Sequence, residues 1–492
     1  MKQLHKQYEK LRAQYPEDKL LILFDIDGTI LDMRCMMLYV LKAYDEEHGT
    51  EYFEQLRLAD VTVHENQVET LLKSRNIPSN QRRGVLGWYV EHRWTPSAIL
   101  HSHHPFAGVM DVIRWFQIQP RTSVGLNTGR PEAIRADTLR SLNELGKEYR
   151  VRFSDELLFM NPGGWEEGVR NSKGKGVKHF QEAGYRIFAM VDNEPDNLEV
   201  VAEADEHGEI LLLHADTIFE TKRSKLPAGT ADGAEYDITE LIPERALPQR
   251  IQFVWHGLND EANIRQFLAS DIHWAEFDVR TGPEGSELIL RHDSIAKTPL
   301  QEDEELVRLD ELLTRMERFD KCLKLDLKEG GEMVERMIEL VRTRRYDSRR
   351  LWFNGNVEVL EEEGIRKLAG ALPGSILQVP IDFLVPLIAT LAEQGRIMLD
   401  TLSDWGVNRF SISWKEPELT RLLDHIDRWG FEVNLYAVPD LESFLRAVLL
   451  QPRSITSDFN FPKWHYYGRG SGEGAERHEY SLRPDPHVTS KN

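Results

Sequence analysis

The chain is poor in cysteine, in long apolar runs and in positive charge, and each shortage excludes a class of protein. Its 492 residues include two cysteines, Cys35 and Cys322, which are too few for the disulfide framework of a small secreted protein. No apolar run reaches the roughly 18 residues that a membrane-spanning helix needs. The first residues, MKQLHKQYEKLRAQYPEDK, lack the apolar segment of a secretory signal. We therefore expect a cytoplasmic protein without a membrane span.

The shortage of positive charge argues against nucleic acid as a partner. The 61 Lys and Arg residues are outnumbered by 82 Asp and Glu residues, and the formal net charge is -21. A polyanion would be repelled by this balance unless a local basic patch reversed it. The composition, 41% hydrophobic and 29% charged, is otherwise typical of a globular protein with sizeable cores. The sequence does not indicate an oligomeric state.

The length predicts two to four domains, and the stretch LIPERALPQR, with two prolines and few apolar residues, marks a boundary. Before it, the runs KLLILFDI, TSVGLNT, RIFAMVD and EILLLHA have the apolar character of buried parallel strands. After it, eight further runs alternate with helical patterns: IQFVW, HWAEFDV, CLKLDLK, RLWFNG, SILQVP, NRFSIS, EVNLYAV and SITSD. We expect an α/β domain over residues 1–245 and a closed (β/α)8 TIM barrel over residues 250–465. Residues 466–492 are polar and glycine-rich, which is typical of a loosely ordered tail.

The first predicted strand ends in two carboxylates. In LILFDIDGTIL, Asp25 and Asp27 leave the strand at its C-terminal end, where open α/β sheets bind ligands. An aspartate can attack phosphorus and form an aspartyl-phosphate. A second aspartate can protonate the leaving oxygen and then activate water. Two close carboxylates repel each other unless a cation lies between them, so the pair also indicates Mg²⁺.

Three later stretches offer the other parts of such a site. VGLNTGRP places the hydroxyl of Thr128 at the end of a second strand, where it can hold a phosphate oxygen. NSKGKGV offers Lys173 or Lys175 to neutralise the transferring phosphoryl group. AMVDNEPDN places Asp192 and Asp196 after a third strand, as cation ligands or their supports.

These four motifs resemble, in order, those of the haloacid dehalogenase superfamily of phosphatases over about residues 15–242. The resemblance implies a Rossmann-like, doubly wound core in which Asp25 is the nucleophile and Asp27 the general acid and base. It implies that Thr128 and Lys173 bind phosphate, with Lys175 as the rival lysine.

The same resemblance implies a bound Mg²⁺ and a cap. The ion would be held by Asp25, by Asp192 and in part by the backbone carbonyl of Asp27. Residues 31–104, which have helical patterns, stand where the family has a helical cap that closes over the substrate. At their end, HSHH contains residue types that bind metals, but a proline-opened helix follows, so we interpret HSHH as the hinge between cap and core.

Polar residues of the second half gather at or near the ends of its first strands. His256 and Asn259 follow the first strand in WHGLND, and Glu276 and Asp278 lie two apart on the second strand, hence on one side of it. The pair His292 and Asp293 follows a short strand, and Asp326 and Lys328 lie two apart on the third barrel strand. These strand ends form the catalytic face of a β/α barrel.

The residue types in this group match phosphodiester hydrolysis. Three carboxylates, Glu276, Asp278 and Asp326, can hold one divalent cation, Mg²⁺ or Ca²⁺. Two histidines, His256 and His292, can act as base and acid. The cation together with Lys328 can stabilise the charge on the phosphate.

The order of these residues resembles the glycerophosphodiester phosphodiesterases and the wider phospholipase-C-like barrels, over about residues 251–462. Asp458 in SITSDFNFP would be the counterpart of the terminal aspartate. The sequence departs from the family in three ways: Gly257 directly follows His256, Asp326 replaces a glutamate, and the stretch from His292 to Asp326 is short. The resemblances imply a two-domain hydrolase of small phosphorylated substrates. The alternative is a phosphatase whose barrel is an inactive binding or dimerisation module.

Overall fold

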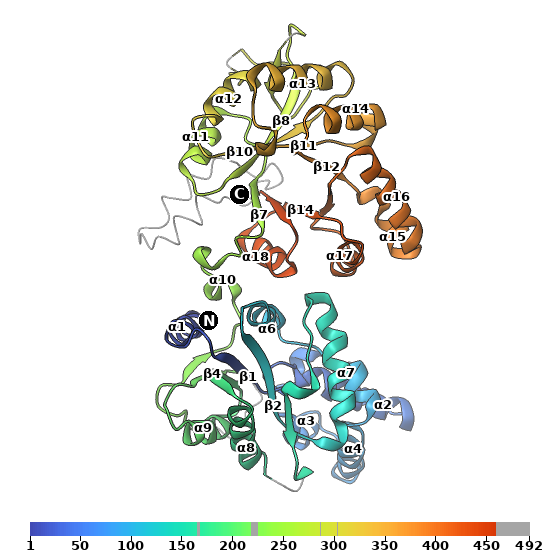
Figure 1. The fold of residues 1–492 in the computed structure, drawn as a ribbon. Coiled ribbons are helices and arrows are strands. Elements are labelled where there is room, and N and C mark those ends of the chain that lie inside the picture. The colour runs from blue at the N-terminus through green and yellow to red at the C-terminus, as the bar shows by residue number, and fades with distance from the viewer. Residues whose placement is uncertain (165–167, 218–224, 286, 303, 459–492) are drawn as a thin grey trace. The chain divides into compact units, whose positions relative to one another are not determined.

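The computed structural model describes residues 1–164, 168–217, 225–285, 287–302 and 304–458 (Figure 1). The contacts between residues divide the chain into a first unit, Met1–Leu241, and a second unit that begins at Ile242. The predicted tail and the last residues of the predicted barrel range lie outside the described residues. In the described part of the chain, no helix is both long enough and apolar enough to cross a membrane.

A six-stranded sheet forms the centre of the first unit, with the strand order β3-β2-β1-β4-β5-β6. All of its strand pairs are parallel. The strands are β1 (Lys19–Phe24), β2 (Thr122–Pro131), β3 (Leu158–Asn161), β4 (Tyr185–Asp192), β5 (Leu211–Ala215) and β6 (Ala231–Gly233). The chain runs outward from β1 to β3 and then crosses back to β4 on the other side of β1. Such a reversal opens a crevice at the carboxyl ends of the strands.

Helices cover both faces of this sheet, which is why its strands are apolar on both sides (Figure 1). On one face, α8 (Val169–Glu182) and α9 (Pro195–Ala204) form a core with Leu21 and Leu23 of β1. On the other face lie α1 (Lys2–Gln14), α6 (Val109–Gln117) and α10 (Ile238–Leu241). There the rings of Tyr8, Phe116 and Phe188 contact one another at centroid distances of 5.3–5.4 Å. Helix α7 (Arg135–Gly146) follows β2 in the chain.

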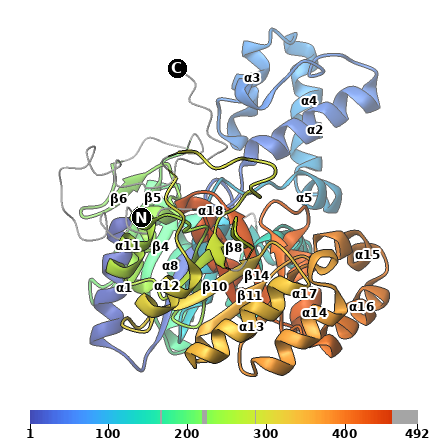
Figure 2. The same cartoon turned by 90° about the horizontal axis from the view of Figure 1, so that it is seen from above.

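A helical insert separates β1 from β2, as the sequence predicts for residues 31–104. It contains α2 (Met33–His48), α3 (Val68–Ser74), α4 (Ser79–His92) and α5 (Pro96–Ser102), and Figure 2 shows the first three grouped together. Asp32 begins α2 by accepting a hydrogen bond from the backbone N–H of Arg34. Gly49 ends α2 in the left-handed conformation, which glycine adopts without strain.

Eight parallel strands of the second unit close into a barrel, and all eight are the strands that the sequence predicts. They are β7 (Gln252–Trp255), β8 (Trp274–Thr281), β10 (Cys322–Leu327), β11 (Leu351–Asn354), β12 (Ile376–Pro380), β13 (Arg409–Ser413), β14 (Val433–Val438) and β15 (Ser454–Ser457). Each pairs with the next, β15 pairs with β7, and β8 pairs with β10 to complete the ring. The short β9 (Leu288–Leu290) adds to β8 in antiparallel fashion.

Helices follow the strands of the barrel in chain order, as the alternating pattern predicts. They are α11 (Glu261–Ala269), α12 (Leu309–Met316), α13 (Glu332–Arg344), α14 (Val357–Ala371), α15 (Val385–Thr390), α16 (Ala392–Trp405), α17 (Leu419–Arg428) and α18 (Leu441–Leu450). Inside the ring, Val254, Trp274 and Trp352 form an apolar cluster. The register places Glu276 beside Lys324 and Asp278 beside Asp326, so the polar residues of β8 and β10 lie at matching heights.

Candidate active sites

A buried lysine joins two of the predicted aspartates at the carboxyl ends of β1 and β4. The Nζ of Lys173, on α8, lies 2.6 Å from Asp25 Oδ1 and 2.7 Å from Asp192 Oδ2, and it donates to the backbone oxygen of Asn127 at 2.6 Å. Lys173 is fully buried, whereas Lys175 is exposed. The structure therefore brings Lys173, and not Lys175, to the predicted nucleophile.

The surroundings of Asp25 oppose ionisation of its carboxyl group. Burial raises the pKa of Asp25 to about 8, and the nearby carboxylates of Asp192 and Asp27 add to the rise, while Lys173 opposes it. A nucleophilic aspartate must be ionised, and Lys173 alone does not offset burial and the two neighbouring carboxylates. Additional positive charge at this position would favour the carboxylate form.

The donor set fits a hard cation such as Mg²⁺. Asp25 and Asp192 converge closely enough to share one ammonium group, and both offer the oxygen ligands that Mg²⁺ prefers. Asp192 Oδ1 is oriented by the backbone N–H of Glu194 at 2.9 Å and by the side-chain amide of Asn197 at 3.1 Å. Oδ2 of Asp25 receives no hydrogen bond from the described residues, which leaves it able to bind a cation or to attack.

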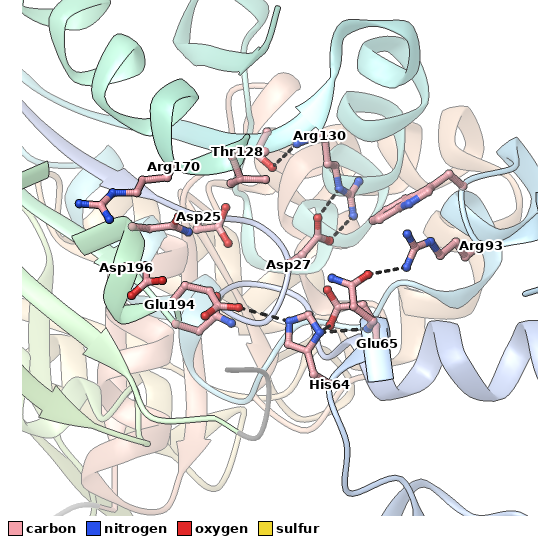
Figure 3. Close-up of a pocket in the computed structure, with 16 residues that line it drawn as sticks. Asp25, Asp27, His64, Glu65, Arg93, Thr128, Arg130, Arg170, Glu194 and Asp196 are labelled. Atoms are coloured by element: carbon pink, nitrogen blue, oxygen red, sulfur yellow. Dashed lines mark hydrogen bonds and ion pairs between the residues drawn. The ribbon is translucent and has the colours of Figure 1, made fainter. Parts of the chain in front are cut away.

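Arg130 donates two hydrogen bonds to Asp27. The sequence interpretation did not include this arginine. Its Nε donates to Asp27 Oδ2 at 2.8 Å and its Nη2 donates to Asp27 Oδ1 at 2.6 Å, a bidentate arrangement (Figure 3). The backbone N–H of Arg130 also donates to the hydroxyl of Thr128 at 3.2 Å. The stretch TGRP thus supplies both the predicted phosphate-binding hydroxyl and the partner of Asp27.

A second layer of contacts fixes the guanidinium of Arg130, whose side chain is 1% exposed. Nη1 donates to Thr138 Oγ1 at 3.0 Å, Nη2 lies 3.2 Å from His103 Nε2, and the Trp94 ring lies 5.0 Å from Cζ. His103 in turn contacts Ser141 Oγ at 2.7 Å through Nδ1, and burial lowers its pKa to about 2. The HSHH stretch therefore supports Arg130 through a neutral histidine.

A cavity of about 280 Å³ lies above these groups. Asp25, Asp27, Thr128 and Arg130 line its inner end, and Arg170, Glu194 and Asp196 line its side. The helical insert contributes His64, Glu65, Asn66, Arg93 and Trp94 (Figure 3). Asp196 thus lies at the cavity and not in the lysine cluster.

Three carboxylates converge at the carboxyl ends of β8 and β10 in the barrel. Glu276, Asp278 and Asp326 each place an oxygen within 4.8 Å of the other two, and theirs is the single such cluster of potential metal ligands in the described residues. Their oxygens fit Mg²⁺ or Ca²⁺ as ligands. These are the three residues that the sequence predicts for the barrel's cation.

Two lysines also contact this carboxylate cluster. Lys328 Nζ lies 2.8 Å from Asp278 Oδ1 and contacts Asp326 Oδ2 directly. Lys324, which is 2% exposed and which the sequence interpretation missed, lies 2.9 Å from Glu276 Oε2 and donates to Thr456 Oγ1 at 2.9 Å. In this arrangement the predicted phosphate ligand Lys328 is bound to the carboxylates.

Amide side chains orient the same carboxylates. Asn259 donates to Asp278 Oδ2 at 2.5 Å, and the backbone N–H of Asp278 donates back to Asn259 at 2.9 Å. Asn354 donates to Asp326 Oδ1 at 2.7 Å and accepts from Gln378 at 2.6 Å. Both aspartates are therefore held in one orientation.

The pKa values of the three carboxyl groups are shifted in different directions. Burial opposes ionisation of Glu276 and Asp278. Nevertheless, Lys324 holds the pKa of Glu276 below its usual range, and Lys328 does the same for Asp278. Burial and the charge of Glu276 raise the pKa of Asp326. Burial lowers the pKa of Lys328, yet Asp326 and Asp278 outweigh it and leave that pKa raised.

The two predicted histidines occupy different environments. His256 lies 3.6 Å from Glu276 Oε1 through Nε2, and its Nδ1 contacts the carboxylate of Asp458. The His292 side chain is 68% exposed and pairs with Asp293 at 3.1 Å. Among the described residues, no hydrogen bond or ion pair joins the His292 ring to the carboxylate cluster. The structure thus brings His256 to the cluster, while His292 stands apart from it.

Comparison with known proteins gives structural matches without sequence matches. No family model matches the chain, and no curated protein matches it in sequence. A phosphodiesterase from Oleispira antarctica, solved with its product sn-glycerol-3-phosphate, is 16% identical with a TM-score of 0.35, over 46% of this chain and 98% of that chain. A glycerophosphodiester phosphodiesterase from Agrobacterium tumefaciens is 14% identical with a TM-score of 0.32, over 42% of this chain and 96% of that one.

A second kind of match is to a haloacid dehalogenase-like hydrolase from Streptococcus pneumoniae. It is 14% identical with a TM-score of 0.27, over 39% of this chain and 83% of that one. All three structures are at most 16% identical to this chain and have TM-scores of 0.35 or below. Both kinds of phosphoester hydrolase that the motifs resemble are nevertheless among the structures similar to parts of this chain.

Proposed function

We propose that the chain is a two-domain hydrolase of phosphoric esters, with a phosphomonoesterase site in residues 1–245 and a phosphodiesterase site in residues 250–465. The observation that carries the first activity is the cluster of Asp25, Lys173 and Asp192 beside Asp27 and Thr128. Carboxylate, ammonium and hydroxyl groups are the parts that an aspartyl-phosphate mechanism needs at one place.

In the first site Asp25 attacks phosphorus through Oδ2, the oxygen that Lys173 leaves free. Lys173 and the Thr128 hydroxyl bind the phosphoryl oxygens and disperse their charge. Asp27 binds a proton before the reaction and donates it to the leaving alcohol, and the resulting carboxylate, held by Arg130, then takes a proton from the water that cleaves the aspartyl-phosphate. A bound Mg²⁺ on Asp25, Asp192 and the Asp27 carbonyl would offset the negative charge of the reacting groups.

The experiment for the first site is hydrolysis of a small phosphomonoester by the wild-type chain and by Asp25→Asn. We expect the variant to lose at least a thousandfold in kcat, because an amide cannot form the phosphoenzyme. Asp155→Asn is the matched control, because the Asp155 side chain is 71% exposed and lies outside the cavity. Equal activity in Asp25→Asn and the wild type would refute the proposed nucleophile.

In the barrel, the arrangement of His256 between Asp458 and Glu276 supports general acid–base catalysis. Asp458 fixes the ring through Nδ1 and leaves Nε2 directed toward the carboxylate cluster. A divalent cation on Glu276, Asp278 and Asp326 would polarise the phosphodiester. His292 is the proposed second histidine, and for this role its exposed ring has to turn toward the substrate.

One observation favours the second candidate, an inactive barrel that only binds a ligand. Lys324 and Lys328 already pair with all three carboxylates, which reduces the charge available to a cation. Hydrolysis of a small phosphodiester by His256→Ala, with His273→Ala as control, separates the candidates, because His273 is exposed and precedes β8. A catalytic His256 predicts loss of diester hydrolysis in the first variant alone. A wild-type chain with no diester turnover at any cation concentration would contradict catalysis by the barrel and favour the binding module.

A further inference from the structure

The wall of the phosphatase cavity that faces away from the core belongs to the helical insert. Its side chains come from two segments, residues 64–66 before α3 and residues 93–94 after α4. Figure 3 shows Glu65 and Arg93 on the side of Asp27 that is opposite Asp25 and Arg170. A phosphoryl group on Asp25 would direct its leaving alcohol toward Asp27, and so toward this wall.

His64 joins this wall to the core. His64 is 4% exposed, and its Nε2 lies 3.4 Å from Glu194, on the loop between β4 and α9. Its Nδ1 accepts a hydrogen bond from the backbone N–H of Asn66 at 3.0 Å, next to Glu65, and the Glu65 residue is 9% exposed. Oε2 of Glu65 is buried and has no hydrogen-bond partner among the described residues, so it is available to a ligand in the cavity.

The wall offers both hydrogen-bond acceptors and donors. Glu65 supplies carboxylate oxygens, while Arg93 supplies guanidinium N–H groups. Arg93 Nη1 is anchored on Asn66 Oδ1 at 2.7 Å, and its buried Nε has no hydrogen-bond partner among the described residues. The Trp94 ring lies between two guanidinium groups, 5.8 Å from Cζ of Arg93 and 5.0 Å from Cζ of Arg130.

Mixed charge in the cavity disfavours a charged leaving group of either sign. A carboxylate or second phosphate would meet the carboxylates of Glu194 and Asp196. An ammonium would meet Arg93 and Arg170. A hydroxyl group donates one hydrogen bond and accepts others, so it satisfies both kinds of side chain without placing an unpaired charge in the cavity.

The size of the cavity limits the number of such hydroxyl groups. About 280 Å³ is just below the range of roughly 300–1,000 Å³ that holds drug-sized ligands. This volume suits a phosphate with a few-carbon polyol or a single sugar ring, and excludes a polymer from the closed form.

We propose that Glu65 and Arg93, with Asn66 as the anchor of Arg93, recognise the hydroxyl groups of the leaving alcohol, so that the substrate class of the first site is small phosphorylated polyols and monosaccharides. This inference rests on the proposed phosphatase function, because it takes Asp25 and Asp27 as the fixed phosphoryl end of the ligand. Side chains of the helical insert, and not those at the strand ends, would then select the leaving alcohol.

Binding to the Asp25→Asn chain tests the inference without relying on turnover. Calorimetry with Mg²⁺ present would compare glycerol 3-phosphate with phosphoglycolate, which carries an anionic leaving group, phosphoethanolamine, which carries a cationic one, and inorganic phosphate, which has none. We expect glycerol 3-phosphate to bind most tightly. Glu65→Leu and Arg93→Met should each lower its affinity, relative to inorganic phosphate, about tenfold, the loss of one good hydrogen bond.

Glu69→Gln is the matched control, because Glu69 is exposed on α3 and pairs with Lys73. The inference is overturned if phosphoglycolate or phosphoethanolamine binds as tightly as glycerol 3-phosphate. It is also overturned if both wall variants weaken inorganic phosphate by the same factor as the polyol. The proposed phosphatase function fails separately, if the wild type binds these esters with the expected ranking but hydrolyses none of them.

Discussion

Arg130 and Asp27 form a bidentate ion pair, with Nε to Oδ2 at 2.8 Å and Nη2 to Oδ1 at 2.6 Å. Because both carboxylate oxygens are held, the proposed acid and base has one orientation before substrate arrives. Replacing Arg130 with Lys keeps the charge but removes the second hydrogen bond, since an ammonium cannot reproduce the planar fork. We expect kcat for phosphomonoesters to fall about a hundredfold, the cost of a misplaced catalytic group.

The control for this prediction is Arg140→Lys, at an exposed position of α7. Steady-state kinetics and thermal melting of both variants distinguish a local effect from unfolding. A kcat for Arg130→Lys within twofold of the wild type would show that Asp27 does not depend on this arginine.

Glu65 makes the stability of the first unit depend on pH. Burial raises the pKa of Glu65 from its ordinary 4.5 to about 7. Between these two values the unfolded chain has lost the proton that the folded chain retains, so stability falls as the pH rises, by at most about 3 kcal/mol. Glu65→Gln removes this dependence.

The measurement for Glu65 is the melting temperature of Glu65→Gln minus that of the wild type, followed from pH 5 to pH 8. We expect this difference to increase with pH, because the cost of ionising the buried carboxylate is absent from the variant. A difference that is flat or decreases with pH contradicts the raised pKa.

Lys324 neutralises Glu276 inside the barrel, with Nζ 2.9 Å from Oε2 and both side chains almost fully buried. Lys324→Met leaves a carboxylate without its partner, which we expect to lower the free energy of unfolding by about 3 kcal/mol. Adding Glu276→Gln to the same chain should recover most of the loss, because the uncompensated charge is removed. Urea denaturation at pH 7 measures both variants, and additive losses in the double variant would refute the pairing.

Cation binding by the barrel depends on the carboxylate cluster. In a chain carrying Asp192→Asn, which removes the proposed ligand of the first site, millimolar Mg²⁺ or Ca²⁺ should still raise the melting temperature of the second unit. Adding Asp326→Asn should abolish this rise, because one of the three converging oxygens is lost. Asp310→Asn, on α12 and outside the cluster, is the control. A rise that survives in the Asp326→Asn chain would place the cation elsewhere.

Strand positions and strand-end carboxylates could be predicted because both depend on local sequence pattern. All eight barrel strands are apolar runs bounded by turns, and each lies where the pattern predicts it. The sequence interpretation missed two strands of the first sheet. Strand β6 is Ala-Asp-Gly and has no large apolar residue, and β3 is a short strand of four residues. These two strands pair with β2 and β5, and a local sequence pattern does not encode such pairing.

The missed site residues depend on contacts between distant segments. Arg130 and Lys324 have polar partners 103 and 48 positions earlier in the chain, at Asp27 and Glu276 respectively. For Arg130 a signal existed, because it follows Thr128 by two positions at the same strand end. Glu65 and Arg93 lie in the loops of an insert, and only the fold places them above Asp27.

Phosphorus NMR of one small glycerophosphodiester, incubated with the chain and Mg²⁺, tests the central claim that two independent hydrolytic sites occupy one polypeptide. With two independent sites, we expect the wild type to convert the diester to inorganic phosphate, Asp25→Asn to stop at the monoester, and His256→Ala to leave the diester intact. Inorganic phosphate from the Asp25→Asn chain, or consumption of the diester by the His256→Ala chain, would contradict that claim.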